Sequence, residues 1–166
     1  RYNGGGFIPD RMIEILARTP LHYRKRRGLE PEATPGINHR GPKAMLINGY
    51  SSSGGDALPY YFRKLKLGPI IGTRTWGGLI GVSGNPALAD NGILLAATFR
   101  FLDTDNRWAV ENEGVAPDIE IALDPVAFNR GEDSQLEAAI REIQAQLQAA
   151  PPKPFVAPPL PTEPGR

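Results

Sequence analysis

The feature that most constrains the fold is a break near the end of the first third of the chain, where a short apolar run turns into a helix through a serine-rich segment. Residues 44–48 (AMLIN) form the apolar run, and residues 51–56 (SSSGGD) follow it after Gly49 and Tyr50. Apolar residues then recur at helical spacing, and residues 69–72 (PIIG) form a second short apolar run. A strand, a helix and a strand at this spacing predict a parallel, right-handed βαβ crossover.

The serine-rich turn has two interpretations. A strand-to-helix turn exposes a side chain at the edge of the sheet, so a serine there can act as a nucleophile, and the start of the helix supplies partial positive charge for an oxyanion. The alternative is an ordinary loop with a helix N-cap, because Ser and Asp commonly start helices and Gly is common in turns. Asp56 is expected to cap or complement the start of this helix in either case.

The remaining elements are predicted from periodicity and turn residues. Pro9 and Asp10 open a helix that ends before Pro20, and residues 20–42 are polar and predict an irregular surface excursion. Residues 73–86 form a glycine-rich loop, and turns at 90–92 and 103–106 flank a predicted strand at 93–99. Asp133 or Ser134 caps a last helix, and a proline-rich tail follows Ala150, extended or lying on a partner surface. We expect four aromatic residues to pack in the core, namely Tyr2, Tyr60, Tyr61 and Phe62.

Composition excludes several classes of protein. The chain has 166 residues, 40% of them hydrophobic, and a net charge of +1, which fits one folded domain without a basic surface for nucleic acid. Residues 24–27 (RKRR) form the one basic cluster, which we interpret as a solvated loop. The chain contains no cysteine and no apolar run near the ~20 residues that a membrane span needs. No metal-ligand spacing is present, so we expect no metal. The charge balance and the lack of a long apolar run lead us to expect no nucleic-acid and no membrane partner, and we also expect no cofactor.

Three motifs together resemble the tail-specific (C-terminal processing) serine peptidases, and most closely those of tricorn type. They are residues 1–6 (RYNGGG), residues 48–56 (NGYSSSGGD) and residues 114–121 (GVAPDIEI), and the resemblance spans residues 1 to about 125. It implies an α/β fold, the crotonase/Clp-peptidase-like spiral of βαβ units with an added β-hairpin region. We expect a catalytic domain over residues 1–150, cut at its N-terminus, and a Pro-rich C-terminal tail over residues 151–166.

The family contains two chemistries, and the sequence favours one of them. The processing peptidases use a Ser–Lys dyad, but Gly78 stands where the lysine would be. The tricorn type instead uses a histidine, positioned through a second serine and a glutamate, and residues 74–78 (RTWGG) resemble its loop. The resemblance therefore implies the tricorn type.

The resemblance implies roles for several residues. Ser53 is the nucleophile, Glu111 is the charge-relay partner, and the N–H groups of Gly6 and Gly54 form the oxyanion hole. Glu113 lies close enough to Glu111 to be an alternative. Residues expected to bind substrate are Gly5, Trp76, Gly77 and Gly78, although Trp76 could instead fill the core. Because Gly54 stands where the tricorn type carries an aspartate, we expect an apolar or broad specificity pocket.

The base histidine of the family lies upstream of the oxyanion glycines, before residue 1. His22 and His39 both fall in the polar excursion and are interpreted as surface histidines. The expected function is a cytoplasmic serine peptidase that cleaves peptides or unfolded polypeptides, with homo-oligomerisation, a hexamer by resemblance. One alternative is a non-catalytic peptide-binding or assembly module on the same fold. Another is a crotonase-like acyl-CoA enzyme, which the serine turn and residues 114–118 disfavour.

Overall fold

The centre of the molecule is a small parallel sheet. The computed structural model describes residues 1–153 and 155–159, so residues 154 and 160–166 of the predicted tail lie outside the described residues. The sheet has the order β3 (Met45–Ile47), β4 (Ile70–Gly72), β7 (Ile119–Glu120), with all neighbours parallel. Helix α2 (Gly54–Lys64) connects β3 to β4, which confirms the predicted βαβ unit.

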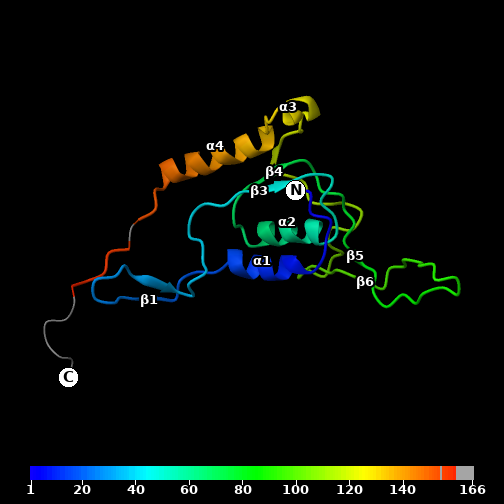
Figure 1. The fold of residues 1–166 in the computed structure, drawn as a ribbon, viewed down its shortest axis with the longest axis horizontal. Coiled ribbons are helices and arrows are strands. Elements are labelled where there is room, and N and C mark those ends of the chain that lie inside the picture. Colours follow the sequence, from blue (N-terminus) through cyan, green and yellow to red (C-terminus); the bar gives the residue numbers. More distant parts are fainter. Residues whose placement is uncertain (154, 160–166) are drawn as a thin grey trace, which may run out of the picture.

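Helices cover both faces of this sheet, as Figure 1 shows, with α4 (Ser134–Ala149) on one side and α2 on the other. Helix α1 (Ile8–Leu16) packs against α2 on the side away from the sheet. Side chains of the strands alternate between the two faces. Ile47 and Ile70 join the core on the α2 side, whereas Ile71 packs with Ala138 and Ala139 of α4. Both apolar runs are therefore buried on two faces, as expected for parallel strands.

The ends of the helices follow capping chemistry. Asp133 is the N-cap of α4 and accepts a hydrogen bond from the Leu136 N–H at 3.0 Å, as the sequence predicts. The same carboxylate forms an ion pair with Arg1, and hydrogen bonding from this guanidinium lowers the pKa of Asp133 to about 2. A short helix that the sequence did not predict, α3 (Pro125–Asn129), is capped by Asp124.

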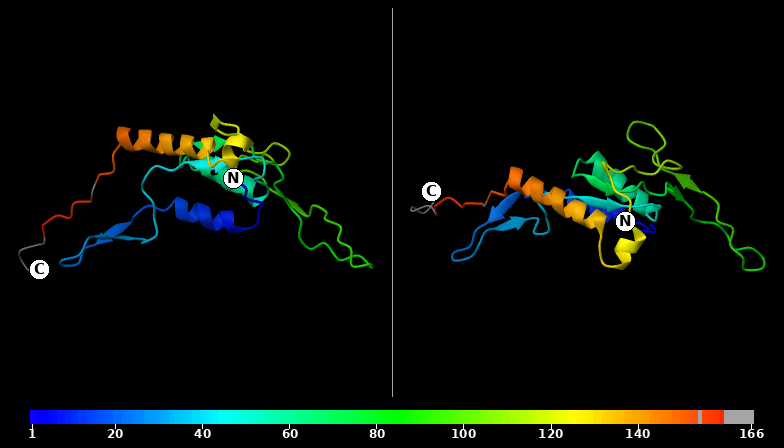
Figure 2. Two further views of the ribbon diagram at one scale, coloured as in Figure 1. Left: turned by 45° about the horizontal axis from the view of Figure 1, so that its top comes forward. Right: turned by 90° about the horizontal axis from the view of Figure 1, so that it is seen from above.

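Two predicted segments differ from the structure. Residues 20–42 contain an antiparallel hairpin, β1 (His22–Arg24) with β2 (Glu32–Thr34), instead of being wholly irregular. The Tyr23 ring on this hairpin stacks on Phe155 of the tail, with ring centroids 4.0 Å apart, so the hairpin gains a partner from the far end of the chain. Figure 2 shows it projecting from the body of the molecule.

The predicted strand at 93–99 is wrong for most of its length. The structure has a two-stranded antiparallel pair, β5 (Ile80–Gly81) with β6 (Phe99–Arg100), and an isolated bridge between Ala87 and Ile93. The intervening loop, residues 82–98, forms a second projecting arm (Figure 2). The turn at 90–92 is confirmed, because Asn91 has a positive φ of 61° and the Leu88 N–H bonds the Gly92 carbonyl at 2.9 Å.

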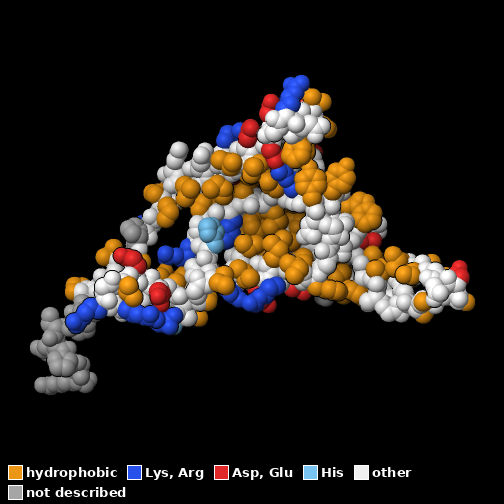
Figure 3. All heavy atoms as spheres, in the orientation of Figure 1, with side chains coloured by type: hydrophobic (Ala, Val, Ile, Leu, Met, Phe, Trp, Pro, Cys, Tyr) orange, Lys and Arg blue, Asp and Glu red, His pale blue; other side chains and the backbone are white. Residues whose placement is uncertain are grey.

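Several apolar side chains remain exposed. Figure 3 shows a hollow between α4 and α1 in which hydrophobic side chains gather, and Leu136 and Ile140 of α4 are 44% and 47% exposed. Phe62 is buried and Tyr60 and Tyr61 are partly buried, as predicted. The core prediction for Tyr2 is wrong, because this side chain is 50% exposed and its ring stacks on that of Tyr50, which is also exposed. Within residues 1–153 and 155–159, no helix combines the length and the apolarity that crossing a membrane requires.

Candidate active site

The three consecutive serines of the turn have different surroundings. Ser51 is buried, and its Oγ lies 3.4 Å from Asn48 Oδ1, so its hydroxyl serves the turn itself. The Ser52 hydroxyl donates to the Gly4 carbonyl at 3.2 Å. Ser53 makes no capping bond to its helix, is partly exposed and lines a pocket. The structure therefore leaves Ser53, among the three, with a hydroxyl available at a pocket.

Ser53 is held in an unusual backbone conformation at the start of α2, with φ 54° and ψ −115°. A positive φ is uncommon for any residue other than Gly and marks a position that the surrounding structure enforces. Here the Ser53 N–H donates to the Gly78 carbonyl at 3.1 Å, and the Ser53 carbonyl accepts the N–H groups of Asp56 and Ala57. This is the local geometry of a strand-to-helix nucleophile turn, with the partial positive charge of the α2 N-terminus beside the hydroxyl.

The glycine segment at residues 4–6 lies against this turn. The Ser52 N–H bonds the Asn3 carbonyl at 2.9 Å, and a Cβ built on Gly5, which has φ +122°, would lie 2.9 Å from Ser53 Cβ. A Cβ on Gly54 would lie 2.3 Å from the Gly6 carbonyl oxygen. Glycine is thus required on both sides of the contact. Among the hydrogen bonds of the described residues, the N–H groups of Gly6 and Gly54 donate none.

A pocket of about 330 Å³ opens beside Ser53. Its walls are mainly apolar, and its lining residues include Ser53, Gly6, Gly54, Asp10, Ala57, Tyr61, Leu79, Gly81, Phe99 and Phe101. Ser53, Ala57 and Tyr61 follow one another at four-residue spacing along one face of α2, so the pocket extends along that helix. Burial, with the Asp10 charge as a second cause, raises the pKa of Tyr61.

Glu111 and Glu113 have different environments. Glu113 is exposed, whereas Glu111 Oε2 is buried and has no hydrogen-bond partner among the described residues. The residues on both sides of Glu111 adopt positive φ angles, 67° at Val110 and 63° at Asn112. A β-branched residue with positive φ is a genuine outlier, so this turn is held under strain with Glu111 at its centre.

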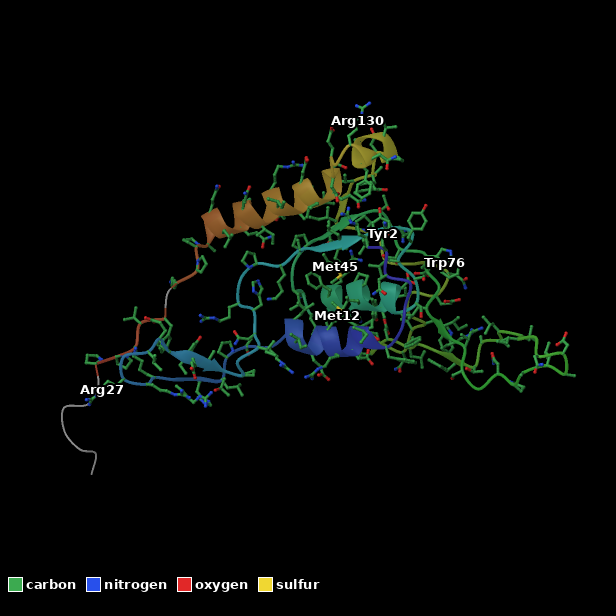
Figure 4. The ribbon with its side chains drawn as sticks, viewed as in Figure 1. Tyr2, Met12, Arg27, Met45, Trp76 and Arg130 are labelled. Carbon is green, nitrogen blue, oxygen red and sulfur yellow. The ribbon has the colours of Figure 1, made fainter. Side chains whose placement is uncertain are left out.

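The loop at residues 75–78 lies between the serine turn and the Glu111 turn. The Trp76 N–H bonds the Ser51 carbonyl at 2.9 Å, and the Asn112 N–H bonds the Gly77 carbonyl at 2.7 Å. Trp76 is 70% exposed, which excludes the core-filling interpretation, and Figure 4 shows it on the outer side of the molecule, on the same side as Tyr2. The structure therefore joins Ser53 directly to Gly78 by a hydrogen bond, and joins Gly77, the residue before Gly78, to the Glu111 turn through Asn112.

Two features of the site were missed by sequence reasoning. Asp56 does not cap its helix, although it lies in the first turn of α2; its carboxylate instead accepts the N–H groups of Gly77 and Gly78. Asp10 and Phe99 line the pocket, and no motif marks either residue.

His22 and His39 are both exposed, as interpreted from the sequence. No cluster of three or more potential metal ligands occurs within the described part of the chain.

The comparisons with known proteins agree with these motifs. The model of peptidase family S41 matches residues 1–121. The tricorn protease of Thermoplasma volcanium is 41% identical over 150 residues, which cover 89% of this chain and 14% of that protein. The chain thus spans about one seventh of the length of the relatives it matches.

Solved structures agree at the level of the fold. A crystal structure of the tricorn protease superposes with a TM-score of 0.80 at 37% identity and covers 90% of this chain and 14% of that one. The photosystem II D1 C-terminal processing protease matches with a TM-score of 0.53 at 23% identity, covering 74% of this chain and 33% of its own, which supports the shared α/β fold alone.

Proposed function

The chain belongs to peptidase family S41, and from this premise we propose that it carries the nucleophile and the oxyanion hole of a tricorn-type serine peptidase acting on peptides or unfolded polypeptides. The observation that carries the proposal is Ser53, which is held at a positive φ of 54° at the start of α2 and lines a pocket beside two glycine N–H groups. An accessible serine with nearby preorganised donors is the arrangement that acyl transfer requires.

The reaction begins when Ser53 Oγ attacks the carbonyl carbon of the scissile bond and its proton passes to a base. The N–H groups of Gly6 and Gly54 stabilise the resulting oxyanion, and loss of one such donor typically costs about 2.7–4 kcal/mol of transition-state stabilisation. Collapse of the tetrahedral intermediate expels the amine, which takes the proton from the base. Water then attacks the acyl-enzyme and releases the second product, restoring the Ser53 hydroxyl.

We assign the base to a histidine outside residues 1–166. His22 lies on the exposed β1 strand and His39 is exposed with its ring 3.4 Å from the Pro42 carbonyl, so neither has an environment suited to activating Ser53. The buried Oε2 of Glu111 supports this assignment, because a carboxylate oxygen without a donor is costly unless another group reaches it. Glu111 is proposed to accept a hydrogen bond from the group that orients the histidine.

The pocket beside Ser53 is proposed to receive the substrate side chain that precedes the scissile bond. Its wall of Leu79, Phe99 and Phe101 favours apolar side chains, and the Asp10 carboxylate disfavours acidic ones. Trp76 and Gly5 are proposed to contact the peptide outside this pocket. The expected cytoplasmic location and the hexameric assembly remain predictions from the resemblance.

A fluorophosphonate probe tests the proposal, because it reacts covalently with activated serines. The probe is applied to the complete polypeptide that contains this chain, to this chain alone, and to Ser53→Ala and Ser52→Ala variants of the complete polypeptide, and intact mass is recorded. We expect labelling of the complete wild type and of Ser52→Ala, and none of Ser53→Ala or of the isolated chain. Absence of labelling in the complete wild type overturns the proposal and leaves a peptide-binding or assembly module.

A further inference from the structure

Asp56 is a fully buried acidic side chain three residues after the proposed nucleophile. Its exposed fraction is 0%, and its two carboxylate oxygens accept hydrogen bonds from adjacent backbone amides: Oδ1 from Gly77 at 2.8 Å and Oδ2 from Gly78 at 3.2 Å. Burying a carboxylate carries a large desolvation cost, which is offset only where the charge has good partners. The position thus holds an acid because two parallel N–H groups need two acceptors.

The dipeptide that Asp56 binds is bonded on its other side to both halves of the proposed site. The Gly78 carbonyl accepts the N–H of Ser53 at 3.1 Å, and the Gly77 carbonyl accepts the N–H of Asn112, the neighbour of Glu111, at 2.7 Å. A Cβ on Gly77 would lie 2.7 Å from the Gly114 N atom, so the dipeptide is also packed directly against the Glu111 turn.

We infer that Asp56 is a positioning residue of the acyl-transfer site: by fixing the Gly77–Gly78 peptide it sets the placement of Ser53 and of the Glu111 turn relative to each other. The inference rests on the proposed function. Asp56 itself lines no pocket beside Ser53 and has no contact with the space where a substrate would lie. Its effect reaches the chemistry through two backbone carbonyls, and a displacement of about 1 Å at reacting groups can cost on the order of 100-fold in rate.

An asparagine at this position retains the shape but replaces one acceptor with an NH₂ group. That NH₂ would face a backbone N–H, so one of the two bonds becomes a repulsive contact and the dipeptide shifts. The matched control is Asp118→Asn. Asp118 Oδ2 also accepts a backbone amide, that of Ile70 at 2.8 Å, and the side chain pairs with Arg63. Among the described residues, no hydrogen bond or ion pair of this side chain involves the serine turn or residues 77–78.

The test measures three quantities on the complete polypeptide: kcat and KM on a reporter peptide, the second-order rate of fluorophosphonate labelling, and the thermal midpoint with the folded fraction. For Asp56→Asn we expect kcat and the labelling rate per folded molecule to fall about 100-fold, with KM changed less than about threefold. Asp118→Asn is expected to lower the thermal midpoint while kcat and labelling stay within about twofold of the wild type. This split distinguishes positioning from a general loss of stability.

Three outcomes overturn the inference while leaving the proposed function standing. They are a wild-type labelling rate in folded Asp56→Asn, a loss confined to KM, and an equal loss of kcat in Asp118→Asn. If Asp56→Asn does not fold, Asp56→Ser, which removes the charge and leaves room for a bridging water, is measured with the same expected loss. An unlabelled wild type instead overturns the proposed function itself, so the two failures are distinguishable.

Discussion

The contact between the glycine segment and the serine turn can be tested by adding one methyl group to Gly55. An ideal Cβ on Gly55 would lie 2.0 Å from the carbonyl oxygen of Asn3. Carbon and carbonyl oxygen approach no closer than about 3.3 Å, so Gly55→Ala forces the two segments apart by about 1.3 Å. The Asn3 carbonyl is also the acceptor of the Ser52 N–H, so this hydrogen bond is strained as well.

The expected loss is larger in catalysis than in stability. Overpacking of this kind costs about 1–3 kcal/mol of folding free energy. Moving Asn3 also carries along the Gly6 N–H, and removing one oxyanion donor costs about 2.7–4 kcal/mol, equivalent to about 10²–10³-fold in kcat. The assay compares kcat and the fluorophosphonate labelling rate of the complete polypeptide with its thermal midpoint.

Gly4→Ala is the matched control in the same segment. A Cβ on Gly4 meets no atom within 4 Å, so this variant is expected to retain the wild-type rate and midpoint. A Gly55→Ala protein that folds and is acylated at the wild-type rate would refute the reasoning, because the glycine segment could then move without affecting the oxyanion. Equal losses in both variants would show that the segment tolerates no change, independently of the contact at Gly55.

Two further predictions concern the pocket and the Arg1 ion pair. Gly81→Ala would place a Cβ 2.0 Å from the Phe99 ring, so we expect the displaced ring to narrow the pocket. The kcat/KM for a peptide with Phe before the scissile bond, divided by the kcat/KM for the matching Ala peptide, is expected to fall about tenfold. An unchanged ratio contradicts the pocket assignment. Because the pKa of Asp133 is lowered to about 2 in the folded protein, chiefly by the hydrogen bond from Arg1, the stability from this pair is present above about pH 4 and lost as the pH falls through 2. As the pH is lowered from 5 to 2, the thermal midpoint is expected to fall less steeply in Asp133→Asn than in the wild type. Parallel curves for the two proteins would contradict the assignment.

The elements around Ser53 could be predicted because their signals are local. Ile47, Ile70 and Ile71 lie in short apolar runs, and the helix between them has a continuous apolar stripe, so strand, turn and helix are each encoded within a few residues. The β1–β2 hairpin lacks such a signal, because its strands, HYR and EAT, contain no apolar run, whereas the equally short β3 and β4 do. Its partners, such as Phe155 against Tyr23, come from distant parts of the sequence, which a local pattern cannot reveal.

The same distinction applies to the site. The resemblance carried by three motifs together predicts Ser53 as the nucleophile, and the glycines at 4–6 predict a close approach of backbone. Asp56 looks from sequence like an acid in the first turn of a helix, a position where acids are favoured by the helix dipole. Its actual partners, Gly77 and Gly78, lie beyond the whole βαβ unit, so only the folded chain shows which amides it binds.

Backbone strain identifies the same site without reference to any family. Of the described residues other than glycine with positive φ, Asn91, Asn106 and Asn112 are asparagines, which tolerate this conformation. Lys66 directly follows the C-cap of α2, where a left-handed residue commonly ends a helix. Tyr2, Ser53 and Val110 have neither reason, and each costs on the order of 1–3 kcal/mol to hold. Ser53 and Val110 lie in turns. These two strained turns are the ones that the Gly77–Gly78 peptide bridges, from Ser53 on one side to the turn after Val110 on the other. Stability is therefore given up at the positions where the proposed nucleophile and its proposed carboxylate partner are held.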